Sequence, residues 1–407
     1  MLIRRLTTVV AAAAALVAAT APASEAKLPR LPRAWPARTF ALGLTDSPGG
    51  AAALKRSGGL RFRYQYLAAG VNTGNGWATW NENGTFVDRY VGESARAGVT
   101  PVFSYYMIRQ SLPGRDNGDE PAAVLSNLRN TATMRAWLAD VRLFFERAGR
   151  FPRTRVVLQV EPDMWGYGQQ AARNDDASTV PVAEVGDLGG LARAVVDLRN
   201  RLAPNVVLGW HLSDWGTKVD LTLNDPSLRR TGMLARRSAR FYRSLHARFD
   251  VTFTDFADRD ASFKRKIYGA GQDIWWTAAD YRRELGFLGT YSRAAHQRVV
   301  AWQIPLGNTL MRAMNDTWGH FQDNHVQWAL GSRRHLRSLA RAGVIALLFG
   351  GGADGTTCAC DGRHDGVTNP APINGNTRGS LSADDDGGYF RARARAIRPY
   401  ARSLRLR

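Results

Sequence analysis

The segment Arg155-Val156-Val157-Leu158-Gln159-Val160-Glu161-Pro162-Asp163 decides the fold. Apolar residues occupy both alternating faces of its extended part, and a charged turn ends it, which is typical of a parallel strand buried on both sides. Seven other segments share this character. The predicted strands are residues 40–44, 62–68, 101–106, 155–160, 206–212, 251–256, 299–304 and 344–349.

Segments with apolar residues at three- and four-residue spacing separate these strands. Gly98, Gly149 and Gly343 follow the last turn of three of them, where glycine commonly ends a helix. Strict alternation of strands and helices predicts an α/β fold, a (β/α)8 barrel, rather than an open doubly wound sheet. The predicted helices are residues 51–57, 86–97, 124–148, 191–202, 234–248, 278–297, 326–342 and 389–404.

The start of the chain is expected to lie outside the barrel. Arg4 and Arg5 precede an uncharged, alanine-rich run. Ala21-Pro22-Ala23 then offers a cleavage site, with Ala26 as the second choice, which is the layout of a secretory signal peptide. The run is shorter than the roughly 20 apolar residues that span a bilayer. We predict a signal peptide at residues 1–26, an N-terminal leader at 27–38 and one barrel domain at 39–407. The protein is expected to be secreted or periplasmic, with no integral membrane span.

The chain carries a formal net charge of +20, mostly from arginine. Because the arginines are spread over the predicted helices, we interpret them as a solvated basic surface and expect no nucleic-acid partner. Attraction to acidic polymers is the alternative. Cys358 and Cys360 are separated by one residue, and we interpret them either as a local disulfide or as two free thiols.

The connections between the predicted elements differ in length. Helix-to-strand turns such as residues 203–205 are short, whereas strand-to-helix loops are long. Barrel enzymes build their sites from strand-to-helix loops, and long loops in a compact domain are usually functional. We therefore predict an active face at the C-terminal ends of the strands. The long loops are residues 161–190, 213–232, 257–277, 305–324 and 350–388.

Polar side chains stand at the end of every predicted strand, and aromatic residues accompany them. Aromatic rings stack on the C–H faces of sugars, while amides and carboxylates bond sugar hydroxyls, so this combination predicts a carbohydrate partner. The candidate substrate-binding residues are Asp46, Gln65, Trp80, Tyr105, Tyr106, Asp163, Trp165, His211, Asp214, Asp258, Gln303, Asn308 and Asp354.

The segment from Val157 to Asp163 resembles the fourth-strand segment of barrel glycoside hydrolases, in which an acidic residue ends an apolar strand. The resemblance implies a secreted glycosidase acting on a polysaccharide or glycan, with Glu161 as general acid or acid/base. In the large clan with carboxylates on strands four and seven, a seventh-strand glutamate is the nucleophile. This chain carries Gln303 there, and an amide can neither attack nor take a proton.

Glycoside hydrolysis normally uses two carboxyl groups, so Glu161 requires a partner. Asp255, at the end of the sixth predicted strand, is the first choice, and Asp163 is the second. Asp214 and Asp258 rank below them.

The surroundings of Glu161 and the role of His211 also bear on this chemistry. Aromatic neighbours such as Trp165, Tyr105 and Trp302 should raise the pKa of Glu161 by desolvation. His211 either bonds a carboxylate or a sugar hydroxyl, or is a satisfied packing residue.

The sequence lacks the motifs of serine hydrolases and of zinc proteases. The chain has no G-x-S-x-G elbow and no H-E-x-x-H pair, so we expect no serine-hydrolase chemistry and no metal or other cofactor. Gln303 motivates an alternative function, a non-catalytic carbohydrate-binding barrel. A third reading, an envelope scaffold, accounts for neither the long loops nor the aromatic residues.

Overall fold

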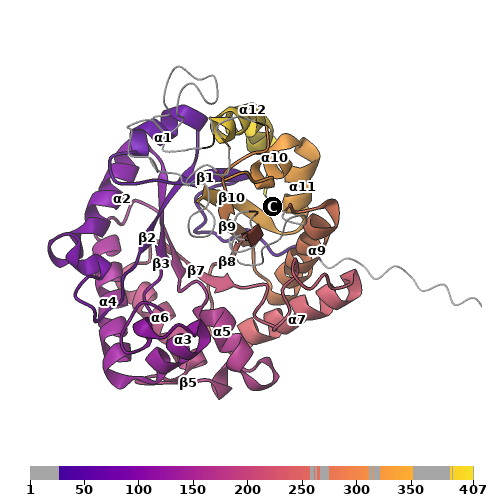
Figure 1. Ribbon diagram of the computed structural model, residues 1–407. Coiled ribbons are helices and arrows are strands. Elements are labelled where there is room, and N and C mark those ends of the chain that lie inside the picture. Colours follow the sequence, from indigo (N-terminus) through magenta and orange to yellow (C-terminus); the bar gives the residue numbers. More distant parts are fainter. Residues whose placement is uncertain are drawn as a thin grey trace, which may run out of the picture.

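The computed structural model describes residues 27–256, 261, 264–265, 275–310, 314, 321–351, 386 and 388–406. In it, eight parallel strands close into a barrel surrounded by helices (Figure 1). Neighbouring strands follow the order β1-β2-β3-β4-β7-β8-β9-β10, and β10 pairs with β1 to complete the ring. The predicted (β/α)8 barrel is confirmed. The predicted signal peptide lies outside the described residues.

All eight predicted strands are confirmed, and each end lies within one residue of its predicted position. They are β1 Ala41–Thr45, β2 Phe62–Leu67, β3 Thr100–Tyr105, β4 Val156–Val160, β7 Val206–Leu212, β8 Val251–Asp255, β9 Val299–Pro305 and β10 Val344–Gly350. The helices are α1 Ala51–Gly58, α2 Thr85–Ala97, α3 Glu120–Arg129, α4 Thr131–Gly149, α5 Met164–Ala171, α6 Leu188–Leu202, α7 Leu228–Ser244, α9 Ala278–Ala295, α10 His325–Gly331, α11 Arg333–Arg341 and α12 Tyr389–Ser403.

Two predicted helices are each broken in two by a short polar side chain. Asn130 is extended, and its side chain accepts a hydrogen bond from the backbone N–H of Thr133, which ends α3 and begins α4. Ser332 likewise separates α10 from α11 by capping the N–H of Arg334. Such side chains satisfy helix-terminal N–H groups, so they favour a new start over a continuous helix. The loop after β4 also contains α5 and the hairpin of β5 (Pro181–Val182) and β6 (Gly186–Asp187), which were not predicted.

The barrel interior is filled by large side chains set against small ones. Phe62, Tyr64 and Trp302 lie there with Val102 and Val157. Glycines make room for them: a Cβ on Gly350 would overlap the hydroxyl of Tyr64, and one on Gly209 would overlap the ring of Phe253. The base of the barrel is closed by the predicted leader segment, because Trp35 packs on Phe62 with ring centroids 5.0 Å apart.

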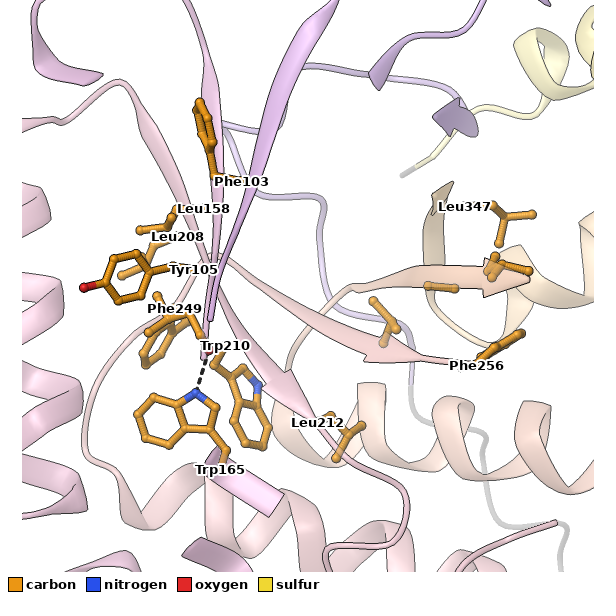
Figure 2. Packing of buried hydrophobic residues seen from close by; sticks show 14 of the residues in the cluster. Phe103, Tyr105, Leu158, Trp165, Leu208, Trp210, Leu212, Phe249, Phe256 and Leu347 are labelled. Carbon is orange, nitrogen blue, oxygen red and sulfur yellow. Dashed lines mark hydrogen bonds between the residues drawn. The ribbon is translucent and has the colours of Figure 1, made fainter. Parts of the chain in front are cut away.

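A second apolar layer lies between the outer face of the barrel wall and the helices. Figure 2 shows part of it, with Leu158, Leu208 and Tyr105 on the outer side of neighbouring strands. Trp210 stacks on Tyr242 at 5.0 Å and meets Trp165 edge-on at 6.3 Å. In the ranges that the structure describes, no helix is both long and apolar enough to cross a membrane.

Candidate active site

A network of polar contacts crosses the inner face of four adjacent strands. The Ser104 hydroxyl on β3 donates to Gln159 Oε1 on β4 at 2.8 Å. Gln159 Nε2 lies 2.8 Å from His211 Nδ1 on β7, and His211 Nε2 lies 3.3 Å from Asp255 Oδ1 at the end of β8. His211 is fully buried, and Asp255 is 7% exposed. The expectation that His211 bonds a carboxylate agrees with this arrangement.

The orientation of the Gln159 amide determines which nitrogen of His211 carries the proton. The Gln159 amide is placed with its oxygen toward the Ser104 hydroxyl and its nitrogen toward His211. An amide nitrogen only donates, and Nδ1 must therefore accept. The N–H of a neutral ring is then Nε2, which lies 3.3 Å from Asp255 Oδ1. Asp255 is thus presented to the barrel mouth by a defined tautomer.

The opposite side of the mouth is formed by aromatic rings and an amide. The Tyr66 hydroxyl on β2 donates to Gln303 Oε1 on β9 at 2.5 Å. Trp302 lies between this pair and the histidine, 5.6 Å from the Tyr66 ring and 5.9 Å from the His211 ring. Its indole N–H is buried and has no hydrogen-bond partner among the described residues. A buried donor of this kind can bind a substrate oxygen, since leaving it unpaired is costly.

A second carboxylate, Asp163, stands on the rim at the end of β4. It is half-buried. The pKa of the nearby Tyr106 hydroxyl is raised above its usual range, first by the burial of Tyr106 and then by the charge of Asp163. The Tyr106 ring lies 6.4 Å from Tyr66, which links this rim to the mouth. Farther out, the Tyr167 ring lies 4.8 Å from that of Trp215. The rim therefore combines aromatic faces with a carboxyl group.

Three of the twelve non-glycine residues with a positive φ among the described residues lie at these strand ends. Glu161, Asp163 and Gln303 have φ angles of 47°, 69° and 49°. The left-handed region is unfavourable for side chains with a Cβ, and such residues cluster at functional sites, at a cost of roughly 1–3 kcal/mol each. Two of the three lie in the Glu-Pro-Asp turn, so this turn is held in shape by its surroundings.

Glu161 lies on the opposite side of the barrel wall from Asp255, which corrects the expectation that it is at the centre of the mouth. Its carboxyl group accepts hydrogen bonds from Trp137 Nε1 at 2.6 Å and from the backbone N–H groups of Met107 and Ile108 at 3.1–3.2 Å. Trp137 belongs to α4, in the outer apolar layer. Strand alternation from Gln159 would turn Glu161 inward, but its left-handed backbone reverses that direction.

The expected rise in the pKa of Glu161 is present, with a different set of neighbours. Burial raises its pKa to about 8, against the hydrogen bonds from Trp137, Ile108 and Met107. Glu161 is fully buried. A group with no exposed surface and three protein donors anchors the loop after β3 to α4, and no substrate oxygen can reach it in this conformation.

Four other predicted substrate-binding residues are also held in structural contacts. The Tyr105 hydroxyl donates to Asp140 at 2.6 Å, and Trp165 Nε1 donates to the Val160 carbonyl at 2.8 Å, both in the outer layer. Both side chains are fully buried, so they cannot stack on a sugar.

Asp46 and Asn308 are likewise occupied. Asp46 pairs with the fully buried Arg63 at 2.8 Å, and desolvation, opposed by Arg63, raises the pKa of Asp46 to about 6. Asn308 is fully buried and joins the loop after β9 to the segment before α12, by donating to the Asp386 carbonyl at 2.8 Å. Both side chains stabilise the fold through contacts within the protein and do not face the mouth.

The remaining predicted residues are scattered. Gln65 lies between Tyr64 and Tyr66, so alternation turns it away from the barrel interior. Asp214 is buried in the loop after β7, and Trp80 is 39% exposed, with its N–H bonded to the Asn75 carbonyl. Outside the described residues lie Asp258, Asp354, Cys358 and Cys360.

Sequence reasoning did not select Ser104, Gln159 or Tyr66. A usable signal exists for Gln159, a polar residue at an inward position of an otherwise apolar strand, two residues before Glu161. Ser104 and Tyr66 have no comparable mark, because their role depends on strands that pair only in the fold. Within the described ranges, no group of three or more His, Cys, Asp or Glu side chains could hold a metal ion.

No protein-family model matches this chain, and no curated protein matches its sequence. Three solved structures are similar to it over most of this chain. The exo-β-1,4-mannosidase Op5Man5 from Opitutaceae bacterium strain TAV5 is similar with a TM-score of 0.51 at 11% identity, over 93% of this chain and 62% of that one. An endo-β-1,4-mannanase from Cellulomonas fimi has a TM-score of 0.48 at 13% identity, over 89% of this chain and 71% of that one. D-psicose 3-epimerase from Clostridium cellulolyticum H10 has a TM-score of 0.39 at 9% identity, over 90% of this chain and 99% of that one.

This chain thus matches less than two thirds of the mannosidase, because the similar part covers 62% of the length of that protein. At 11% identity the likeness to the mannosidase concerns the fold alone.

Proposed function

We propose that this protein is a glycoside hydrolase that cleaves glycosidic bonds in a polysaccharide or glycan, with its carboxylates at the barrel mouth. The observation that carries the proposal is Asp255, which is oriented by His211 and opens onto a mouth walled by aromatic rings. A carboxylate beside sugar-sized aromatic faces and an unpaired buried N–H suits a neutral polyhydroxylated substrate. The fold is also that of an exo-β-1,4-mannosidase.

The second carboxylate of this proposal is Asp163, in place of Glu161. Asp163 is half-buried on the rim, whereas Glu161 is fully buried in the outer layer. In the proposed reaction Asp163 donates a proton to the leaving oxygen as the glycosidic bond breaks. Asp255 either attacks the anomeric carbon or takes a proton from the water that does, and the separation of the two carboxyl groups selects between these outcomes.

The test is turnover of a glycan panel by the purified protein and three carboxamide variants. Asp255→Asn and Asp163→Asn should lose activity. The control Asp197→Asn, on the exposed face of α6, should retain it. Equal turnover by Asp255→Asn and the unmodified protein on every substrate would exclude Asp255 from the chemistry.

A second candidate function is a non-catalytic carbohydrate-binding barrel. Gln303 favours it, because this half-buried amide accepts from Tyr66 and cannot act as a nucleophile. The two functions are separated by measuring binding and turnover together. Glycan binding of equal strength by the unmodified protein and Asp255→Asn, with no turnover by either, would identify the binding barrel.

We further propose that the protein is exported and that residues 1–26 are removed. The support is the basic start, the apolar run and the small-residue cleavage site in the sequence. N-terminal sequencing of protein recovered from the culture medium or periplasm should begin near Lys27. Protein retained inside the cell with Met1 intact would contradict export.

A further inference from the structure

A cavity of about 240 Å³ lies at the base of the barrel, at the end opposite the mouth. Its walls are the segment that enters β1, the C-terminal end of α1 and the C-terminal end of α12. Figure 1 shows α1 and α12 side by side. None of the proposed catalytic chemistry involves this end of the molecule.

The lining is strongly basic. It contains five cationic side chains and no acidic residue, and none of the five pairs with a carboxylate among the described residues. The two helix ends offset this charge only in part, because a helix C-terminus carries roughly half a negative charge. The cations are Arg38, Lys55, Arg61, Arg398 and Arg402.

The cations are close enough to repel one another. Burial, and then the charges of Arg61 and Arg402, lower the pKa of Lys55. Lys55 donates to the Gly98 carbonyl at 2.7 Å and Arg61 to the Pro36 carbonyl at 2.7 Å, so both are oriented by neutral acceptors. An uncompensated group of like charges is stabilised by any anion that enters it.

The shape of the cavity is set by the fold. Gly59 has a φ of 64°, and a side chain there would collide with the guanidinium of Arg398. This glycine therefore lets Arg398 lie across the end of α1. The chain end is held against the same wall, because Phe40 N–H donates to the Leu404 carbonyl and Leu406 N–H to the Arg38 carbonyl, both at 3.0 Å.

We propose that this basal cavity, lined by Arg38, Lys55, Arg61, Arg398 and Arg402, binds a ligand with carboxylate or phosphate groups. Guanidinium groups match both oxyanions in a bidentate manner. The cavity is several times the roughly 30 Å³ that one water occupies, so it has room for a charged unit the size of a monosaccharide. Such a unit is either a free small molecule or one residue of an acidic polymer.

The experiment compares the full mature chain with a cavity variant, Lys55→Gln/Arg398→Gln, by calorimetric titration at fixed ionic strength. The matched control, Arg229→Gln/Arg236→Gln, removes two exposed charges from α7. The probes are inorganic phosphate, galacturonic acid, oligogalacturonate and neutral dextran. The cavity variant should bind the anionic probes at least about tenfold more weakly, since it lacks two charge-assisted contacts, and the control should bind like the unmodified chain.

Each outcome bears on the proposal. Equal affinity for monomeric and oligomeric anions identifies a free small ligand, and tighter binding of the oligomer identifies an acidic polymer. Equal losses in the cavity and control variants would mean that total surface charge attracts the probes, which overturns the site. Binding of no anionic probe by the unmodified chain, or equal binding of neutral dextran, would also overturn the proposal. If circular dichroism shows that the cavity variant is unfolded, Arg38→Gln/Arg402→Gln, at two exposed positions, replaces it.

Discussion

Asp255 and Glu161 both stand at the ends of parallel strands, but they lie on opposite faces of the barrel wall. Asp255 faces the mouth, is 7% exposed and has its Oδ1 3.3 Å from His211 Nε2. Glu161 faces the helices, is fully buried and receives three N–H groups. The comparison shows that a carboxylate at a strand end becomes available for chemistry only if the local backbone turns it inward.

The largest expected effect separates the two carboxylates by activity. Asp255→Asn should lower kcat by at least about 100-fold, because the amide can neither attack nor accept a proton. Its unfolding midpoint should stay close to that of the unmodified protein, since the amide can still accept from His211. Turnover on the glycan panel and thermal unfolding check this. An active Asp255→Asn would place the chemistry elsewhere.

Glu161→Gln should show the opposite behaviour. Its amide NH2 would meet the N–H groups of Trp137, Met107 and Ile108, which should destabilise the fold by about 1–3 kcal/mol. Below its unfolding transition the variant should still turn over substrate. Urea unfolding and activity are measured on the same preparation, with Asp197→Asn as the stable control. A stable but inactive Glu161→Gln would return Glu161 to the catalytic role.

Gln159→Met tests whether the tautomer of His211 matters. The thioether keeps the shape but cannot donate to Nδ1, so the ring is free to present either nitrogen to Asp255. We expect kcat to fall roughly 10- to 100-fold with KM little changed, and the pH profile to shift. A purely structural role would lower stability and leave the pH profile of the folded enzyme unaltered.

A pH dependence of stability also belongs to Glu161. Its pKa is 4.5 when exposed and about 8 in the fold, so between these values the folded state holds a proton that the unfolded state lacks. The stability that this group contributes is complete below pH 4.5 and is lost as the pH rises through 8. The free energy of unfolding falls by at most about 1.4 kcal/mol for each pH unit. Glu161→Gln should remove this slope. Parallel urea-unfolding curves from pH 5 to pH 8 would contradict the assignment.

The fold was largely predictable from the sequence because buried parallel strands and their helices leave periodic patterns. The helix breaks at Asn130 and Ser332 were missed, since an apolar periodicity that continues across a polar cap hides the cap. The site was predictable only in part. Asp255, His211 and Gln303 lie at the mouth, whereas Glu161 does not.

By itself the sequence determined the barrel, the end that carries the long loops, and the polar strand ends, because these follow from periodicity and loop length. Only the tertiary structure decided which of those polar groups share a site. The reason is local: the backbone of Glu161, with a φ of 47°, turns its side chain outward, and no pattern of residue types records that rotation. The pairing of β3, β4, β7 and β8 then joins Ser104, Gln159, His211 and Asp255 into one network, although they are far apart in the chain.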